Sequence, residues 1–293
     1  MRYVLENDTL RVEIDSFGAE LKSVKRKSDD KEYMWYADKK YWGRTSPVLF
    51  PFVGNCRNKE YRYGGKTYVM GQHGFARDME HTMESQTADT IWFSLHSNEE
   101  TMEKYPFAFV LKIGYNLTGN ELKVMWKVEN PDTKTLYFSI GAHPAFLCPF
   151  NGEENKLGYG LQFAGLKEVH HHGNTPDTGL AVMSEDIVIP LEDEKVYFTQ
   201  GFFDRCTYMV EGKQTGEVSL VTPDGKPYVT MDFDAPLFAI WSPEGKDAPF
   251  VCIEPWYGRC DADDFEGTLE ERAYENAVEP EQVFEASYSI HYL

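Results

Sequence analysis

The chain has 293 residues, of which 48 are Asp or Glu and 29 are Lys or Arg, so its formal net charge is -19. A chain this acidic repels phosphate backbones and anionic lipid surfaces, which argues against a nucleic-acid-binding or membrane-binding protein. A neutral small molecule is the ligand class that fits this charge best.

The N-terminal residues and the cysteines bear on the cellular compartment in which we expect the protein. Residues 1–8 lack the apolar core of a signal peptide, and no stretch approaches the roughly 20 apolar residues of a membrane span. The cysteines are odd in number, are scattered and form no CxxC pair: Cys56, Cys148, Cys206, Cys252 and Cys260. We therefore expect a cytoplasmic protein with free thiols.

Short alternating apolar runs, separated by turn residues, recur along the chain. In chain order they predict strands over residues 10–14, 19–24, 109–115, 122–128, 136–140, 217–221, 228–233 and 238–240, and a last strand within 278–293. Helical periodicity is weak and predicts only short pieces near 98–104 and 269–277. The acidic segment 261–271 and the run His170-His171-His172 are predicted to be exposed loops. Many strands without a long helix predict an all-β sandwich or barrel, and the absence of a linker predicts one domain over residues 1–293.

Two histidines stand next to residues that shape the backbone. His73 lies in Gln72-His73-Gly74, where the glycine allows close approach of a ligand. His143 lies in Gly141-Ala142-His143-Pro144, directly after a predicted strand. An imidazole titrates near neutral pH, which suits a general acid. By residue type alone, each histidine is equally compatible with a structural role.

A carboxylate interrupts the apolar run Phe250 to Tyr257. Strand alternation places Val251 and Ile253 on one face and Cys252 and Glu254 on the other. A buried, unpaired Glu254 would cost several kcal/mol, so it needs a partner or a chemical role. The neighbouring Trp256 offers a ring for stacking on a sugar.

Other chemistries find less support in the sequence. The histidines form no HExxH motif and no zinc-type spacing, and no phosphate-binding glycine motif occurs, so neither a metal nor a nucleotide cofactor is indicated. A glycosidase needs two carboxylates, and Glu254 with Asp204 keeps that alternative open. Arg44 and Arg57, at the two ends of a proline-bracketed apolar segment, are candidates for binding hydroxyl or phosphate oxygens.

Several segments, in this order, resemble the aldose 1-epimerase (galactose mutarotase-like) family and its LacX-like bacterial branch. They are Pro47 to Pro51 with Gly54, Gln72 to Arg77, Tyr105 to Phe107, Asn130, Gly141 to Phe146, Ile253 to Trp256 with Gly258, and Glu279 to Glu281. The resemblance implies a super-sandwich of two large twisted antiparallel sheets with an open, strand-lined cleft. It also implies a cofactor-free isomerase that interconverts the anomers of a sugar.

The resemblance assigns roles at matching positions. His143 resembles the general acid that protonates the ring oxygen, and Glu254 resembles the general base that takes the proton of the anomeric hydroxyl. A carboxylate and an imidazolium on opposite sides of the sugar ring can make both proton transfers at once, although the sequence does not show which way each faces the ring. The substrate-binding candidates are His73, Arg44, Arg57, Arg77, Asp204 and Trp256.

The sequence leaves the substrate and the assembly open. Asn55 stands where the branch often carries a basic residue, with Arg57 two positions later. Arg44 and Arg77 are similar to the phosphate-binding arginines of hexose-6-phosphate epimerases, although Thr45-Ser46 replaces that subgroup's glycine-rich segment. A free hexose such as galactose or glucose is favoured over a hexose phosphate. A catalytically silent sugar-binding protein is a further alternative, and exposed sheet edges allow a homodimer.

Overall fold

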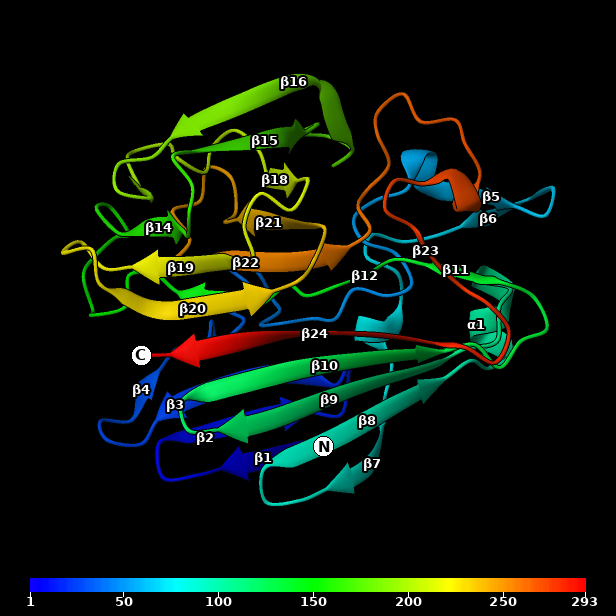
Figure 1. The fold of residues 1–293 in the computed structure, drawn as a ribbon, viewed down its shortest axis with the longest axis horizontal. Helices are drawn as coiled ribbons and strands as arrows, with labels where there is room; N and C mark the ends of the chain where they lie inside the picture. Colours follow the sequence, from blue (N-terminus) through cyan, green and yellow to red (C-terminus); the bar gives the residue numbers. More distant parts are fainter.

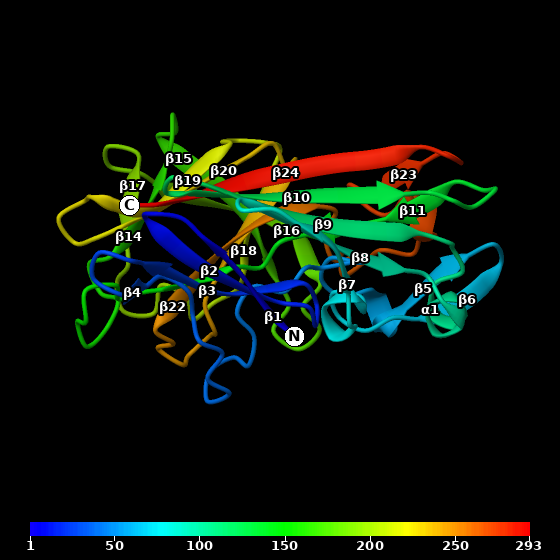
Figure 2. The same cartoon turned by 90° about the horizontal axis from the view of Figure 1, so that it is seen from below.

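The computed structural model describes residues 1–293 and is built almost entirely from antiparallel strands (Figure 1). Its largest sheet forms one twisted layer, part of which is seen in Figure 2. Across that sheet the nine strands are β17 (Lys195–Tyr197), β14 (Gly160–Phe163), β19 (Glu217–Val221), β20 (Pro227–Phe233), β24 (Val283–Tyr292), β10 (Glu121–Glu129), β9 (Val110–Thr118), β8 (Thr90–His96) and β7 (Thr82–Gln86).

The second large sheet has seven strands and carries the residues of greatest chemical interest. Two short strands pair with the same neighbour, and the others follow in order: β12 (Ile140–Gly141) and β13 (Ala145–Leu147), then β22 (Phe250–Tyr257), β21 (Leu237–Trp241), β18 (Tyr208–Glu211), β15 (Glu168–Asn174) and β16 (Ala181–Pro190).

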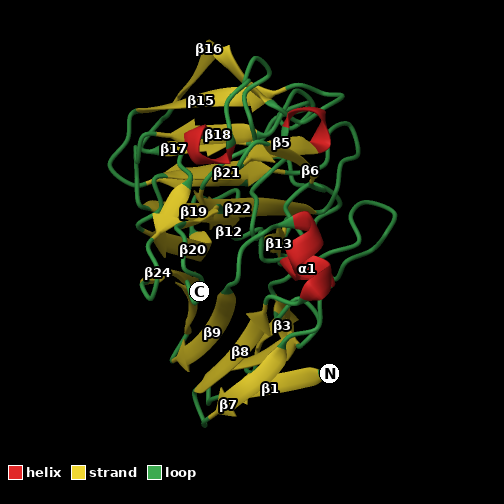
Figure 3. Cartoon of the chain, turned by 90° about the vertical axis from the view of Figure 1, so that its right-hand side faces the viewer, coloured by secondary structure: helices red, strands yellow, loops and turns green.

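Smaller elements surround the two sheets, and helices are few (Figure 3). The small sheets contain β1 (Arg2–Glu6), β2 (Leu10–Asp15), β3 (Glu20–Arg26) and β4 (Lys31–Glu32), the pair β5 (Glu60–Tyr63) and β6 (Lys66–Val69), and the pair β11 (Leu136–Phe138) and β23 (Asn276–Val278). The helical pieces are α1 (Glu99–Lys104) and the 3-10 turns η1 (Arg57–Lys59), η2 (Ala76–Asp78) and η3 (Leu269–Glu271).

The main hydrophobic core joins side chains of both large sheets. Its 60 buried residues include Trp126 and Ile290 of the nine-stranded sheet and Val251 and Ile253 of the seven-stranded sheet. Because successive strand residues point to opposite faces, Cys252, Glu254 and Trp256 face away from this core. The seven-stranded sheet therefore uses one face for the sandwich core and leaves the other for a site.

Most predicted elements are confirmed. Alternation located β2, β3, β9, β10, β19, β20 and β21, and the short helix near residue 98 is α1. The five cysteines are free, as expected, and all of them are buried. No helix of the structure is long and apolar enough to cross a membrane.

One loop prediction is wrong. The histidine run lies within β15, where His171 is buried and its ring meets Tyr208 edge-on at 4.5 Å. Sequence alternation could not show this, because three identical side chains carry no polar-apolar pattern. The acidic segment 261–271 is mostly an exposed or half-exposed loop, as predicted, but its first residue Asp261 is 5% exposed because it is paired with the buried Arg272.

Candidate active site

The register of β22 brings the two catalytic candidates together. Gly141 of β12 pairs with Trp256, and Ala145 of β13 pairs with Cys252. His143 lies in the gap between these two short strands, so it stands opposite Glu254. The predicted acid and base are therefore cross-strand neighbours.

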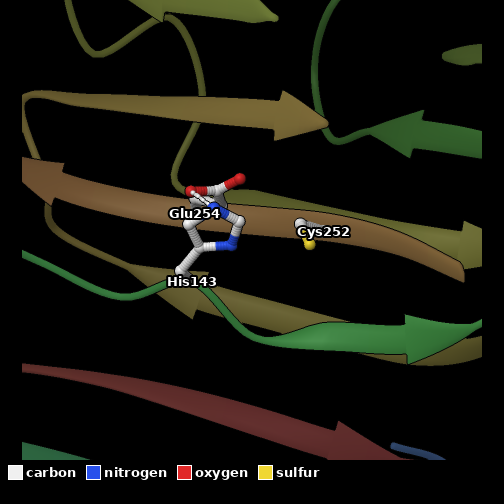
Figure 4. Close-up of side chains that lie close together, drawn as sticks. All are labelled: His143, Cys252 and Glu254. Carbon is white, nitrogen blue, oxygen red and sulfur yellow. Dashed lines mark ion pairs between the residues drawn. The ribbon is translucent and has the colours of Figure 1, made fainter. Parts of the chain in front are cut away.

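The side chains of this pair are close and buried. His143 Nε2 lies 3.4 Å from Glu254 Oε2, and the side chains are 9% and 1% exposed (Figure 4). Neither Glu254 Oε2 nor His143 Nδ1 has a hydrogen-bond partner. A buried, unsatisfied polar atom is costly, so these atoms are poised to meet a polar ligand.

Burial also sets the protonation of the pair. Desolvation raises the pKa of the Glu254 carboxyl well above its usual range. It lowers the pKa of His143 to about 3, and the positive charge of Arg77 acts in the same direction. Because these shifts oppose ionisation of both groups, they favour a protonated carboxyl beside a neutral imidazole over an ion pair.

His73 is held as a hydrogen-bond donor toward the cavity. The backbone N–H of Gly54 donates to His73 Nδ1 at 3.0 Å, and His73 N–H donates to the Gly54 carbonyl at 2.8 Å. Burial lowers the pKa of His73 well below its ordinary value, so the ring is neutral. An imidazole that accepts at Nδ1 carries its proton on Nε2. Position 54 requires glycine, because its φ is +70° and a Cβ there would lie 2.4 Å from Cys260 Cβ.

A cavity of about 420 Å³ opens over these residues. This is within the size range of small-molecule sites. Its walls are mostly polar, and Arg77 and Trp256 lie among them. The other lining residues are Trp42, Gly54, Asn55, Gln72, His73, His143, Asn174, Pro176, Asp177, Thr178, Gly179, Thr207, Met209, Trp241, Glu244, Glu254 and Cys260.

Three of the predicted binding residues do not line this cavity. Arg44 donates to Asp78 Oδ1 at 2.8 Å. Arg57 lies in a second cavity of about 330 Å³, where its Nη1 donates to the Phe265 carbonyl at 3.1 Å. Asp204 lies in a smaller cavity beside Lys156 and accepts from Gly245 N–H at 3.1 Å. The structure therefore brings together His73, Arg77, His143, Glu254 and Trp256, and places the other three elsewhere.

Sequence reasoning missed an aromatic wall and a loop. Trp42 and Trp241 both pack against the His143 ring, with centroids at 4.6 and 5.3 Å. The segment 174–179 closes another side, and Asn55 Nδ2 donates to its Thr178 carbonyl at 2.8 Å. No motif in the sequence pointed to this wall. No feature of the sequence marked the segment 174–179 as part of the site.

One set of side chains could hold a metal ion by proximity. Ligand atoms of His143, Cys252 and Glu254 lie within 4.8 Å of one another (Figure 4). However, burial raises the pKa of the Cys252 thiol and of the Glu254 carboxyl, so both resist the ionisation that a metal requires. The positive charge of Arg77, which lowers the pKa of His143, also opposes a metal cation at this place. The arrangement is better suited to proton transfer.

The buried histidines predict that the fold is sensitive to acid. Burial lowers the pKa of His81 to about 4, and that of His143 to about 3. The unfolded chain takes up protons below about pH 6.5 while these folded imidazoles stay neutral, so stability is full above that pH and falls as the pH drops toward 4. Each group contributes up to about 1.4 kcal/mol per pH unit.

His81 lies outside the cavity and isolates this effect. We expect the urea-unfolding free energy of His81→Leu to fall less between pH 7 and pH 5 than that of the wild type. His96→Gln, at an exposed strand end, should match the wild-type slope. Equal slopes for the wild type and His81→Leu would contradict the prediction.

Comparison with known proteins places the chain in a family. Residues 1–261 match the model of the aldose 1-epimerase family. The chain is 30% identical over 297 residues to the chromosomal protein LacX of Lactococcus lactis subsp. lactis, with 99% of both chains covered. This chain belongs to the aldose 1-epimerase family.

Solved structures of similar proteins show the same fold. A galactose mutarotase related enzyme from Lactobacillus acidophilus superposes with a TM-score of 0.94 at 37% identity, over 100% of this chain and 97% of that one. A galactose mutarotase-like protein from Lactobacillus casei gives a TM-score of 0.90 at 30% identity, over 99% of each chain. The fold is a galactose mutarotase-like sandwich of large antiparallel sheets, as predicted.

Proposed function

We propose that this protein is an aldose 1-epimerase that interconverts the α and β anomers of a free hexose such as galactose or glucose. The observation that carries the proposal is the His143–Glu254 pair, whose reactive atoms lie 3.4 Å apart beside a cavity of sugar size. Family membership and the two similar galactose mutarotase-related structures support it.

The closeness of the pair suits the geometry of the reaction. The anomeric hydroxyl oxygen and the ring oxygen are bonded to the same carbon, so a base for one and an acid for the other must lie near each other. In this proposal the acid and the base are therefore adjacent groups rather than groups on opposite sides of the ring. Each positioned acid or base contributes roughly 100- to 10,000-fold to the rate.

In the proposed reaction, Glu254 takes the proton of the anomeric hydroxyl while His143 protonates the ring oxygen. The bond between the anomeric carbon and the ring oxygen breaks, and an aldehyde forms. Rotation about C1–C2 and the reverse transfers then close the ring as either anomer. The proton that burial favours on Glu254 must first pass to His143, and their 3.4 Å separation allows that transfer.

The other cavity residues serve binding in this proposal. His73 Nε2–H donates to a sugar hydroxyl, because its Nδ1 is already occupied by Gly54. Arg77 offers a largely buried guanidinium whose Nε has no hydrogen-bond partner. Trp256 is 4% exposed and its Nε1 donates to the Ala142 carbonyl at 3.2 Å, so only its ring remains to contact substrate.

Optical rotation tests the proposal directly. Freshly dissolved α-D-galactose and α-D-glucose should approach equilibrium faster with the protein than in buffer alone. A rate equal to that of buffer on both sugars would rule out the free-hexose activity. Hexose 6-phosphates would then be assayed, and direct sugar binding without turnover would indicate the silent sugar-binding alternative. Release of reducing ends from a glycoside would identify a glycosidase.

A hexose phosphate is the second candidate, and one carboxylate argues against it. Asp78 Oδ1 accepts from Arg44 at 2.8 Å, and Asp78 Oδ2 lies 3.7 Å from Arg77 Nε. Asp78 therefore partly neutralises both arginines that a phosphate would need. This favours an uncharged sugar in the cavity.

Removing the negative charge of Asp78 should increase the affinity for a sugar phosphate. We expect Asp78→Asn to bind galactose 6-phosphate roughly tenfold more tightly than the wild type by calorimetry, about 1.4 kcal/mol. Glu80→Gln, a nearby exposed neutralisation, should leave the affinity unchanged. Unchanged affinity in Asp78→Asn would show that Asp78 does not govern phosphate binding.

A further inference from the structure

The imidazole of His143 lacks the contact that usually orients a catalytic histidine. Such a ring is commonly fixed by a hydrogen bond at its second nitrogen, which also sets the tautomer. Here Nε2 faces Glu254, and the buried Nδ1 has no partner. Another interaction must therefore hold the ring in place.

Two tryptophans supply that interaction. The Trp42 ring stacks on His143 with centroids 4.6 Å apart and planes 25° apart. Trp241 meets the imidazole edge-on at 5.3 Å and 86°. The two indoles contact each other at 5.5 Å. A face contact and an edge contact together fix both the position and the tilt of the imidazole.

Trp42 is itself held from behind. Trp35 Nε1–H donates to the Trp42 carbonyl at 2.9 Å, and Phe250 stacks against the Trp42 ring at 5.8 Å. Trp35 and Phe250 are fully buried in a small hydrophobic cluster. The stacking surface is therefore anchored to the protein interior.

Trp42 lies outside the strands that build the sandwich core. It belongs to the irregular connection between β4 and η1, where Tyr36 is 64% exposed. Its own side chain is only half-buried and forms part of the cavity wall. A large aromatic residue in such a connection contributes little to the sandwich core, and its best-defined contact is with His143.

We infer that Trp42 is a positioning residue that holds the His143 imidazole against Glu254 and shields it from water. This inference rests on the proposed function. The charged or titratable groups around the imidazole are Glu254 and Cys252 on β22, His73, Arg77 of η2, and Arg44.

Three variants test this role. Trp42→Leu removes the stacking face, and Trp42→Phe keeps a smaller one. Tyr36→Leu, which changes an exposed aromatic residue of the same connection, is the control. We expect Trp42→Leu to lower kcat roughly 10- to 100-fold with less than about threefold change in KM, because the acid is no longer aligned. Trp42→Phe should recover most of kcat, and Tyr36→Leu should match the wild type.

A second readout follows the histidine itself. In protein labelled at histidine, the His143 ring signals are identified by their loss in His143→Asn, and their titration is followed by NMR. In Trp42→Leu, water reaches the ring, so its titration midpoint should move upward toward the ordinary histidine value. In Trp42→Phe it should stay near the wild-type position.

The kinetic assay and the NMR titration distinguish a failure of the proposed function from a failure of the positioning role of Trp42. If wild type does not accelerate mutarotation, the proposed function fails, while the NMR comparison still reports whether Trp42 holds the ring. If Trp42→Leu keeps the wild-type kcat and the wild-type His143 titration, the positioning role is overturned. A loss of kcat in Trp42→Leu with unchanged His143 signals also overturns it.

Discussion

Glu254→Gln is expected to reduce the mutarotation rate roughly 100- to 10,000-fold, down to the rate in buffer if Glu254 is the only base. The amide keeps the size of the carboxyl but cannot exchange a proton with the anomeric hydroxyl. Folding should be retained, because the neutral amide replaces a fully buried carboxyl whose pKa burial has raised. Polarimetry measures the rate, and thermal unfolding shows that the variant is folded.

Two comparisons make this result specific. Glu266→Gln, an exposed glutamate that pairs with Arg57 at 3.2 Å, should keep full activity. Because His143 and Glu254 act as one unit, the double variant Glu254→Gln/His143→Asn should be about as slow as the slower single variant. Activity in Glu254→Gln close to that of the wild type would remove Glu254 from the mechanism.

Arg272→Met is expected to destabilise the protein by about 3–5 kcal/mol, because it leaves buried carboxyls without their cation. Arg272 Nε donates to Asp261 Oδ1 at 2.7 Å, and its Nη1 donates to Glu275 Oε2 at 3.0 Å. The side chain is 1% exposed, and its guanidinium carbon lies 4.6 Å from the centre of the Phe52 ring. Urea unfolding measures the loss.

This network also reaches the cavity. The Asp261 N–H donates to the Asn55 carbonyl at 3.0 Å, next to the glycine that holds His73. Arg62→Met is the matched control, because Arg62 is exposed and its Nη2 donates only to the Gly267 carbonyl, at 3.3 Å. A loss below about 1 kcal/mol in Arg272→Met would place Arg272 among ordinary surface-type ion pairs.

Local patterns in the sequence predicted much of this molecule. Polar-apolar alternation located strands such as β10 and β19, since each strand faces a core on one side. Alternation also placed Cys252 and Glu254 on the face of β22 opposite Val251 and Ile253, as the core shows. Resemblance at short motifs identified the family, which the comparisons confirm.

The binding residues were harder to predict, because a side chain's partner is not a local property. Arg57 and Asp204 were reasonable by residue type, but the structure directs them into other cavities. Trp42 carried no motif. Its importance follows from its stacking on His143, which depends on how the connection after β4 folds back over the sheet.

The sequence by itself determined the strand alternation, which depends on neighbouring residues. It also determined the free thiols and the kinds of reactive side chain, which follow from residue types and their spacing. Only the tertiary structure decided which side chains meet. The register of β12 and β13 on β22 sets His143 opposite Glu254, and the burial that shifts both pKa values comes from packing around the pair. Strand register and burial depend on residues far apart in the chain, so no local pattern contains them.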